Sequence, residues 1–260
     1  EKDEITAIAY ETIETDDGEL PILTTSSEVA GRMAPIIAGE LLGSFRGGRG
    51  ILLSGVAGTP PAAVVILGAG VLGMNAARAF HNMGAQVTVL DHDLRKLQHV
   101  DTIFEWKVAS MFANSHNIAK AVAFADVLIG AASIPGGKAP ILVSREMLKM
   151  MRKRAVILDM SINSGGCVET SRPTTLADPS YIVDDIIHYC VPNVPARVSR
   201  SASHSLSNSI LPYLLEMGRL GIPEALDQLS DLRRGVNMMN GKLVHPEVAA
   251  ALGKTMEERT

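Results

Sequence analysis

Short apolar runs alternate with amphipathic stretches through the middle of the chain. The runs are rich in β-branched residues, which is typical of strands buried on both faces of a parallel sheet. We expect such strands at 64–67, 86–90, 107–111, 127–129, 155–159 and 186–190. Between them, apolar residues recur at helical spacing and predict helices at about 74–83, 93–103, 117–124 and 144–151. This alternation predicts an α/β fold, a doubly wound parallel sheet with helices on both faces.

The two flanks of this alternation have a different pattern. From 10 to 23, short strand-like pieces surround a turn at Asp16-Asp17-Gly18. Thr25 to Glu28 has the form of a capping box and precedes apolar residues at helical spacing, so a helix should begin there, and Pro35 should kink or break it. Beyond 195, a serine-rich stretch leads into an apolar helix at about 206–217 and a polar, helix-prone tail.

A glycine-rich turn of the form G-x-G-x-x-G follows the first predicted strand of the sheet. Gly68 permits a tight turn, Gly70 removes a side chain that would hold a ligand away from the backbone, and Gly73 lets the next helix lie close to the sheet. That helix directs its free N–H groups and its positive dipole end at the turn. The order strand, turn, helix and strand predicts a Rossmann-type dinucleotide site.

The second strand of this unit ends in Asp91, which lies 18 residues after Gly73. A carboxylate at this spacing accepts hydrogen bonds from both adenosine ribose hydroxyls. Asp91 would also repel a 2′-phosphate, and no arginine directly follows it. The expected cofactor is therefore NAD and not NADP.

The loops after the later strands should meet at the carboxyl end of the sheet, where doubly wound folds bind their ligands. The small residues of 131–140 could form a backbone wall against the cofactor or a plain loop, in which Lys138 is expected to lie in solvent. In the next loop, Asp159 could be a base, although a carboxylate at the end of a buried strand more often caps a turn. Asn163 could hydrogen-bond substrate or cofactor, but an amide has no pKa suited to removing a proton.

The last loop of the sheet region contains two prolines around Asn193 and Val194. The prolines fix an extended backbone, which suits either a rigid hinge between domains or a contact with the nicotinamide ring. Asn193 is the polar group at this position, and Val194 offers an apolar face. Arg197 and Arg200 could bind a carboxylate, but a solvated surface position is the more common role for such arginines.

The two cysteines, Cys167 and Cys190, are too few for a disulfide framework and fit a reducing compartment. No histidine is next to Cys167 in the sequence, and a small buried thiol is much commoner than a nucleophile. His188, Cys190 and the nearby acids do not repeat at metal-ligand spacing, so no metal site is expected.

The composition adds limits on partners. Of the 260 residues, 47% are hydrophobic and 20% charged, and the net charge is −4 with acids and bases interspersed. This charge distribution predicts neither a nucleic acid nor an anionic membrane as partner. No run of about 18 apolar residues occurs and no signal-peptide pattern opens the chain, so we expect a cytoplasmic protein. The chain begins with Glu1 and not with methionine, and we expect it to be part of a longer protein.

Several motifs together resemble the alanine dehydrogenase family, which shares its fold with domain I of proton-translocating transhydrogenase. The similarity covers nearly all of the chain, and its glycine-glycine-cysteine run is closer to alanine dehydrogenases than to transhydrogenases. The matching segments are 27–32, 47–50, 68–70 with Asp91, 134–140, 165–175 and 188–193.

The resemblance implies hydride transfer between the Cα of alanine and NAD, with release of pyruvate and ammonia. It also implies an NAD domain, here at 23–200, between remnants of a discontinuous substrate domain at 1–22 and 201–260, assembled as a homo-oligomer, either hexamer or dimer. Ser27 would contact the cofactor phosphates, and Asn193 would lie beside nicotinamide and substrate. Asn163 and Asn193 are the candidate catalytic residues, and the expected cofactor contacts are Ser27, Gly68, Gly70, Val71, Leu72, Gly73, Asp91, Lys96, Ala131, Ala132, Ile162, Asn163, Asn193 and Val194.

The chain departs from the family pattern in three ways. Alanine dehydrogenases have an aspartate at the position of Asn163, where it supports proton transfer, and usually a methionine at the position of Val194. The family's N-terminal segment, which supplies an arginine, a lysine and a histidine to the substrate site, is absent from this sequence. We therefore expect no deamination by this polypeptide alone. A transhydrogenase-type NAD-binding subunit and a catalytically silent NAD-binding homologue are the alternatives.

Overall fold

The computed structural model describes residues 5–132 and 137–256. The chain divides into two compact units. The larger spans Glu28–Ile134 and Lys138–Arg197, and the smaller is built from the flanking segments up to Ser27 and from Val198 onward. Each unit has its own hydrophobic core. That the flanks belong to a substrate domain stays a prediction.

The larger unit contains a seven-stranded sheet in the order β4-β3-β2-β5-β6-β8-β7. All neighbouring pairs are parallel except the pair of β7 with β8, which is antiparallel. The chain runs outward from β2 through β3 to β4, and then returns to the other side of β2 at β5. The strands are β2 (Ala63–Leu67), β3 (Gln86–Asp91), β4 (Ala109–Phe112), β5 (Val127–Gly130), β6 (Val156–Asp159), β7 (Ser180–Val183) and β8 (Ile186–Tyr189).

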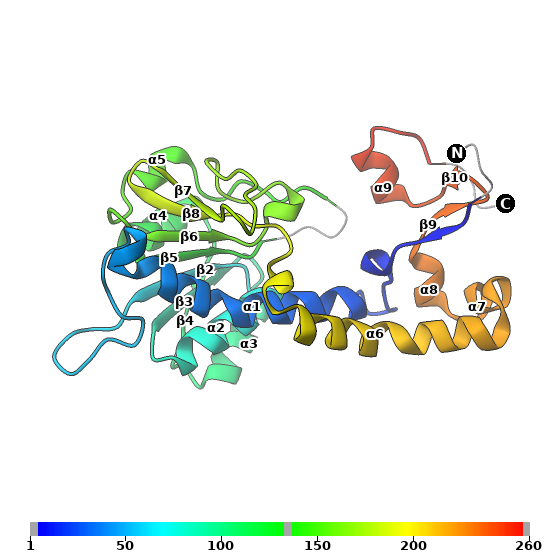
Figure 1. The fold of residues 1–260 in the computed structure, drawn as a ribbon, viewed down its shortest axis with the longest axis horizontal. Coiled ribbons are helices and arrows are strands. Elements are labelled where there is room, and N and C mark those ends of the chain that lie inside the picture. Colours follow the sequence, from blue (N-terminus) through cyan, green and yellow to red (C-terminus); the bar gives the residue numbers. More distant parts are fainter. Residues whose placement is uncertain (1–4, 133–136, 257–260) are drawn as a thin grey trace. The chain divides into compact units, whose positions relative to one another are not determined.

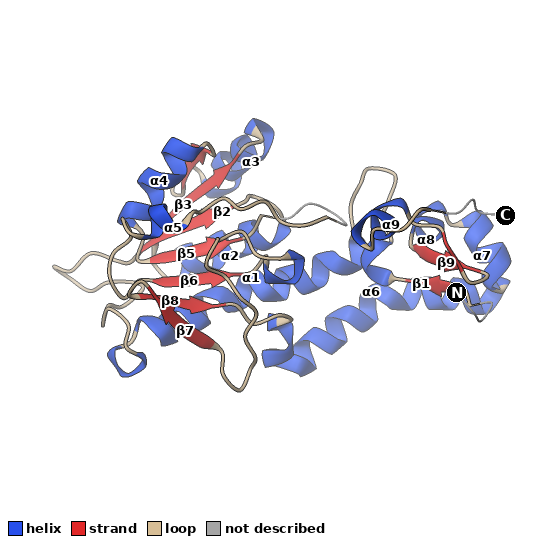
Figure 2. Ribbon diagram, turned by 90° about the horizontal axis from the view of Figure 1, so that it is seen from above, coloured by secondary structure: helices blue, strands red, loops and turns tan. Residues whose placement is uncertain are grey.

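Helices cover both faces of this sheet, as Figures 1 and 2 show. One core contains residues of α1, α2 and α3 together with Val64 and Ile66 of β2. The other contains residues of α4 and α5 together with Val65 and Leu67 of the same strand. Alternate side chains of one strand thus enter opposite cores, which confirms the doubly wound α/β fold. The helices are α1 (Pro21–Leu42), α2 (Val71–Asn82), α3 (Leu94–Phe104), α4 (Ser115–Phe124) and α5 (Arg145–Leu148).

The strand order creates a topological switch point between β2 and β5. Loops leaving the carboxyl ends of these two strands turn in opposite directions, which opens a crevice at this edge of a doubly wound sheet. The glycine turn follows β2, and the loop of Ala131 and Ala132 follows β5. The fold therefore brings the predicted cofactor loops to one edge.

Among the described residues, the smaller unit combines a three-stranded antiparallel sheet with four α-helices and the single-turn helix η1. Its core contains Ile13, Ile22, Leu226, Leu232 and Val236. Its elements are β1 (Ala7–Ile8), η1 (Tyr10–Thr12), α6 (Ser199–Leu220), α7 (Ile222–Gln228), α8 (Ser230–Arg234), β9 (Val236–Met239), β10 (Lys242–Leu243) and α9 (Pro246–Ala251).

The first helix corrects two expectations. It begins at Pro21 and not after the capping box, and the Thr25 hydroxyl donates to the carbonyl of Ile22 inside the helix, 2.9 Å away. Proline suits a helix start because its fixed φ is helical and its missing N–H would be unpaired there. The helix also continues through Pro35 to Leu42. Complete burial of Ala34, Ile37 and Ala38 on this helix offsets the cost of the proline.

Three further elements differ from the sequence prediction. α5 ends at Leu148, three residues early, and β7 was not predicted. Strand-like pieces were expected within 10–23, where the structure has the single-turn helix η1 and the start of α1. The predicted helix at 206–217 is the middle of the longer α6.

Candidate functional site

The three glycines of the turn after β2 have separate roles in the structure. Gly68 has φ +112°, and a Cβ there would lie 2.5 Å from the carbonyl oxygen of Ala131. A Cβ on Gly73 would overlap the carbonyl oxygen of Gly68. A Cβ on Gly70 would meet nothing within 4 Å. Gly68 and Gly73 are thus required by the protein's own packing, whereas Gly70 faces open space.

The N-terminus of α2 adds unpaired donors to this turn. Gly70 is the N-cap residue, and no side chain caps the helix. The first N–H groups of an α-helix, here those of Val71, Leu72 and Gly73, have no partner within the helix. Such groups, with the positive end of the helix dipole, form an anion-binding site. The prediction that this helix presents free N–H groups at the turn fits this geometry.

Asp91 connects the end of β3 to the same turn. Its side chain is only 5% exposed, and its Oδ2 accepts a hydrogen bond from the N–H of Ala69 at 2.7 Å. Its Oδ1 accepts from the N–H of Asp93 at 2.9 Å. One backbone donor per oxygen leaves further acceptor capacity on each. Asp91 thus fixes the turn and can still accept from a ligand hydroxyl.

Two predicted cofactor contacts lie elsewhere on helices. Ser27 is a half-buried residue of α1, and Lys96 is exposed on α3, the helix that follows Asp91. Their contacts with a cofactor stay predictions.

The loops after β5 and β6 are joined by hydrogen bonds. The N–H of Ala131 donates to the carbonyl of Leu67 at 2.8 Å, and the Ser161 hydroxyl donates to the carbonyl of Ala132 at 2.6 Å. Residues 133–136 of the expected backbone wall lie outside the described residues. Lys138 is exposed, as expected. These bonds hold three consecutive loops of the carboxyl edge together.

Asp159, at the end of β6, caps the turn that follows it. Its Oδ1 accepts from the N–H of Ser161 at 3.1 Å, and its Oδ2 accepts from the N–H groups of Cys167 and Val168 at 2.9 and 3.2 Å. The residue is 1% exposed. The turn-capping interpretation of Asp159 is confirmed, and a role as catalytic base is not supported.

Cys167 is a buried thiol of the same turn. Burial, and then the neighbouring Asp159 carboxylate, raise the pKa of its thiol far above the ordinary value. A thiol in this environment stays protonated and is a poor nucleophile. The expectation that Cys167 is a small buried thiol is confirmed.

The two candidate catalytic asparagines follow neighbouring strands, β6 and β8. Asn163 is exposed in the single-turn helix η3 (Ile162–Ser164). Asn193 is also exposed and has φ +54°. Ile162 and Val194, next to them, are 5% and 4% exposed, so their side chains pack mainly into the protein. The topology brings both asparagines to the carboxyl edge, and their contacts with cofactor and substrate stay predictions.

Sequence reasoning missed two groups at this edge and the ion pair of a third. It missed the backbone N–H of Ala69, which holds Asp91, and the hydroxyl of Ser161, which holds Ala132. Arg197 is an exposed residue, as expected, but its side chain is 28% exposed and pairs with Glu40 at 3.3 Å, which was not expected. Because these partners are 157 residues apart, no local signal could reveal the pair.

His188 is a buried residue of β8. Its Nε2 lies 2.8 Å from the Thr170 hydroxyl and its Nδ1 3.0 Å from the carbonyl of Ile186, so both ring nitrogens have partners. Within 5–132 and 137–256, no group of three His, Cys, Asp or Glu residues is arranged to hold a metal ion. In the same segments, no helix has the length and apolar character needed to cross a membrane.

Comparison with known proteins places this geometry in a family. Residues 34–246 match the family described as alanine dehydrogenase/PNT, C-terminal domain. The alanine dehydrogenase of Methanococcus maripaludis is 46% identical over 248 residues, which are 95% of this chain and 66% of that protein. The chain belongs to the alanine dehydrogenase/PNT family. The alanine dehydrogenase of Mycobacterium tuberculosis is 43% identical over 97% of this chain and 68% of that protein.

Solved structures agree with this assignment. An L-alanine dehydrogenase superposes with a TM-score of 0.90 at 43% identity, over 95% of this chain and 68% of that chain. A transhydrogenase from Sinorhizobium meliloti superposes with a TM-score of 0.74 at 23% identity, over 92% of this chain and 68% of that one, which shows a common fold alone. The family is one of NAD-dependent oxidoreductases, and this chain spans about two thirds of the length of its relatives.

Proposed function

We propose that this chain is the NAD-binding part of an enzyme of alanine dehydrogenase type. Such an enzyme takes a hydride from the Cα of L-alanine, passes it to NAD and, with water, yields pyruvate and ammonia.

One observation carries the proposal: the turn at Gly70 is open, and the groups around it are arranged to hold a dinucleotide. The N–H groups of Val71, Leu72 and Gly73 would bind the pyrophosphate at the helix N-terminus. Asp91, fixed by Ala69, would accept the ribose hydroxyls. NAD, when bound, supplies the hydride acceptor.

The asparagines would act on the nicotinamide half of the cofactor. Asn193 follows β8 and would orient the ring and the substrate through its amide. Asn163 follows β6, where it can donate or accept a hydrogen bond but cannot take a proton at neutral pH. Because the amide cannot accept a proton, we expect proton removal from the substrate to be slow when Asn163 is at this position.

Substitution of Asn163 in the whole protein that contains this chain tests the proposal. Asn163→Asp should raise alanine-dependent NADH formation at pH 9–10 by roughly 100-fold or more, the scale of a restored general base. Asn163→Ala is the control and should give no gain. If Asn163→Asp binds NADH as tightly as the parent and still gives no increase, the protein is an NAD-binding homologue that does not deaminate alanine.

We also propose a homo-oligomer, hexamer or dimer, in the cytoplasm, with the smaller unit forming part of the substrate domain. The family assignment supports this, and light scattering of the whole protein measures the assembly directly. A monomer at micromolar concentration would contradict it.

A further inference from the structure

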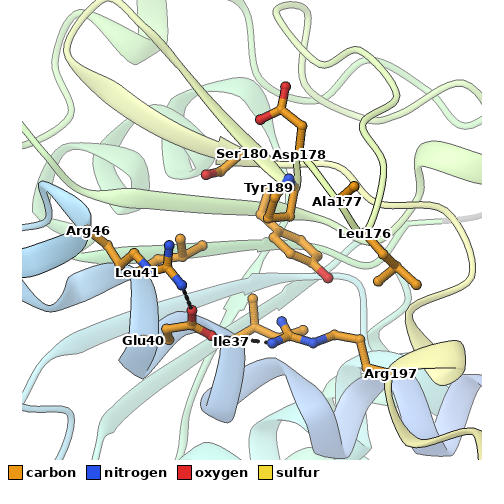
Figure 3. A pocket seen from close by; sticks show the side chains of 11 residues that line it. Ile37, Glu40, Leu41, Arg46, Leu176, Ala177, Asp178, Ser180, Tyr189 and Arg197 are labelled. Atoms are coloured by element: carbon orange, nitrogen blue, oxygen red, sulfur yellow. Dashed lines mark hydrogen bonds and ion pairs between the residues drawn. The ribbon is translucent and has the colours of Figure 1, made fainter.

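A cavity of about 390 Å³ lies in the larger unit, and no residue of the glycine turn lines it (Figure 3). Its lining residues come from α1, the single-turn helix η2 (Ser44–Arg46), the loop before β7 and the start of β7, the end of β8 and the turn that follows Asn193. None of the residues expected to contact NAD lines it. Its apolar surface includes Ile37 and Leu41 of α1 and Leu176 of the loop.

Tyr189 places an unpaired hydroxyl in this cavity. The residue is 1% exposed, and its hydroxyl has no hydrogen-bond partner among the described residues. Figure 3 shows the ring extending from the end of β8 with the hydroxyl turned toward the side of Arg197. Burial raises the pKa of Tyr189, and the Arg197 guanidinium close to the hydroxyl partly opposes this, although the two groups do not meet the geometry of a hydrogen bond. A buried hydroxyl without a partner is costly, so it points to a ligand atom in the cavity.

The charges beside Tyr189 favour an anion. Glu40 lies between two arginines: its Oε1 is 2.7 Å from Arg46 Nη2 and its Oε2 is 3.3 Å from Arg197 Nη2. Burial of the Glu40 carboxyl acts to raise its pKa, but Arg197 and Arg46 outweigh this and lower it. Glu40, Arg46 and Arg197 together carry one net positive charge, which Asp178 balances over the lining as a whole, so the positive charge is local to the two arginines. A guanidinium presents several N–H donors in a fixed plane, and these match the two oxygens of a carboxylate.

The charged and apolar side chains of the wall narrow the class of anion that the cavity could bind. Glu40 and Asp178 both contribute to the wall, so a dianion such as a phosphate monoester would meet two negative charges. The apolar side chains of Ile37 and Leu41 would accommodate a short hydrocarbon chain. We infer that this cavity binds a small organic monocarboxylate, with its carboxylate between Arg197 and the Tyr189 hydroxyl and its alkyl part against α1.

Calorimetric titration with sodium butyrate at constant ionic strength tests the inference. We expect saturable binding that is unchanged when the protein is saturated with NADH. Tyr189→Phe removes only the unpaired hydroxyl and should weaken binding severalfold, and Arg197→Gln should weaken it by roughly tenfold or more. Arg219→Gln is the matched control: Arg219 pairs with Glu216 on α6, outside the cavity, and its loss should not change binding.

Two further probes identify the ligand chemistry. Butyramide has the shape of butyrate without its charge and should not bind, and methyl phosphate should bind more weakly than butyrate. The inference is overturned if butyrate does not saturate, if NADH displaces it, or if Tyr189→Phe and Arg197→Gln bind it as the parent does. Tighter binding of methyl phosphate than of butyrate would contradict the assignment to a carboxylate. Thermal unfolding of each variant establishes that it is folded.

Discussion

Asp91 and Asp159 end two strands of the same sheet, at the same edge, and differ in how the protein uses their oxygens. Asp91 accepts one backbone N–H on each oxygen. Asp159 accepts three, and the thiol of Cys167 lies 3.7 Å from its Oδ1. Asp91 therefore retains acceptor capacity for a ligand, whereas the acceptor capacity of Asp159 is occupied by groups of its own turn. A strand-end carboxylate therefore becomes a ligand group only where the following loop leaves its lone pairs free.

The surrounding glycines differ in the same way. Next to Asp159, a Cβ on Gly130 would lie 2.5 Å from Cys167 Sγ, and one on Gly166 would lie 2.8 Å from Asp159 Oδ2. Next to Asp91, Gly70 has no neighbour at all in that direction. The region around Asp159 is closed at Gly130 and Gly166 but open at Gly165, and the region beside Asp91 is open at Gly70 but closed at Gly68 and Gly73. The contrast between the closed region of Asp159 and the open region of Asp91 therefore depends on the two carboxylates and on Gly70.

The largest effect on stability is expected from removing the Asp159 carboxylate of the closed region. Asp159→Ala would leave three buried N–H groups without a partner, so we expect a loss of about 3–5 kcal/mol in the free energy of unfolding. Asp159→Asn keeps one acceptor oxygen and should lose less. Chemical denaturation measures both. A loss below about 1 kcal/mol for Asp159→Ala would show that the turn does not depend on this carboxylate.

Gly73 and Gly70 of the open region should differ in what their replacement by alanine changes, stability or NADH binding. Gly73→Ala forces a Cβ onto the Gly68 carbonyl and should destabilise the fold by about 1–3 kcal/mol. Gly70→Ala meets no protein atom and should change stability by less than about 0.5 kcal/mol, yet weaken NADH binding by reaching into the ligand's space. Thermal unfolding and NADH fluorescence titration check both. Equal effects of the two changes on stability would remove the distinction between these glycines.

The smallest effect concerns the buried His188 of β8. Burial lowers its pKa in the folded protein, so between that value and the ordinary value of 6.5 the unfolded chain binds more protons. Its stabilising contribution is complete above pH 6.5 and is lost as the pH falls through the folded pKa. His188→Asn should flatten this acid slope in urea denaturation between pH 7 and 5. An unchanged slope would assign the pH dependence to other groups.

The sequence predicted those parts of the molecule that depend on neighbouring residues. The glycine turn, Asp91 and the six parallel strands all have local signals of spacing or apolar pattern. β7 was missed although it pairs with β8 across a turn of two residues, because Ser180–Val183 is a short, partly exposed strand at the edge of the sheet. The pair of Arg197 with Glu40 and the cavity at Tyr189 depend on segments far apart in the chain, and no pattern in either segment encodes them.

The central claim is that Asp91 is available to the cofactor, and calorimetric titration of NADH tests it most directly. The control is Asp126, another strand-flanking aspartate with a 5% exposed side chain, at the opposite end of the sheet before β5. Its Oδ2 accepts from the N–H of Ala63 at 2.9 Å, and its Oδ1 pairs with Arg49 and Arg152 at 3.1 and 2.9 Å. We predict that Asp91→Ala weakens NADH binding by roughly 10- to 100-fold, the scale of hydrogen bonds to a charged group. Asp126→Ala should bind NADH as the parent protein does. Parent-like NADH binding by folded Asp91→Ala would contradict the account.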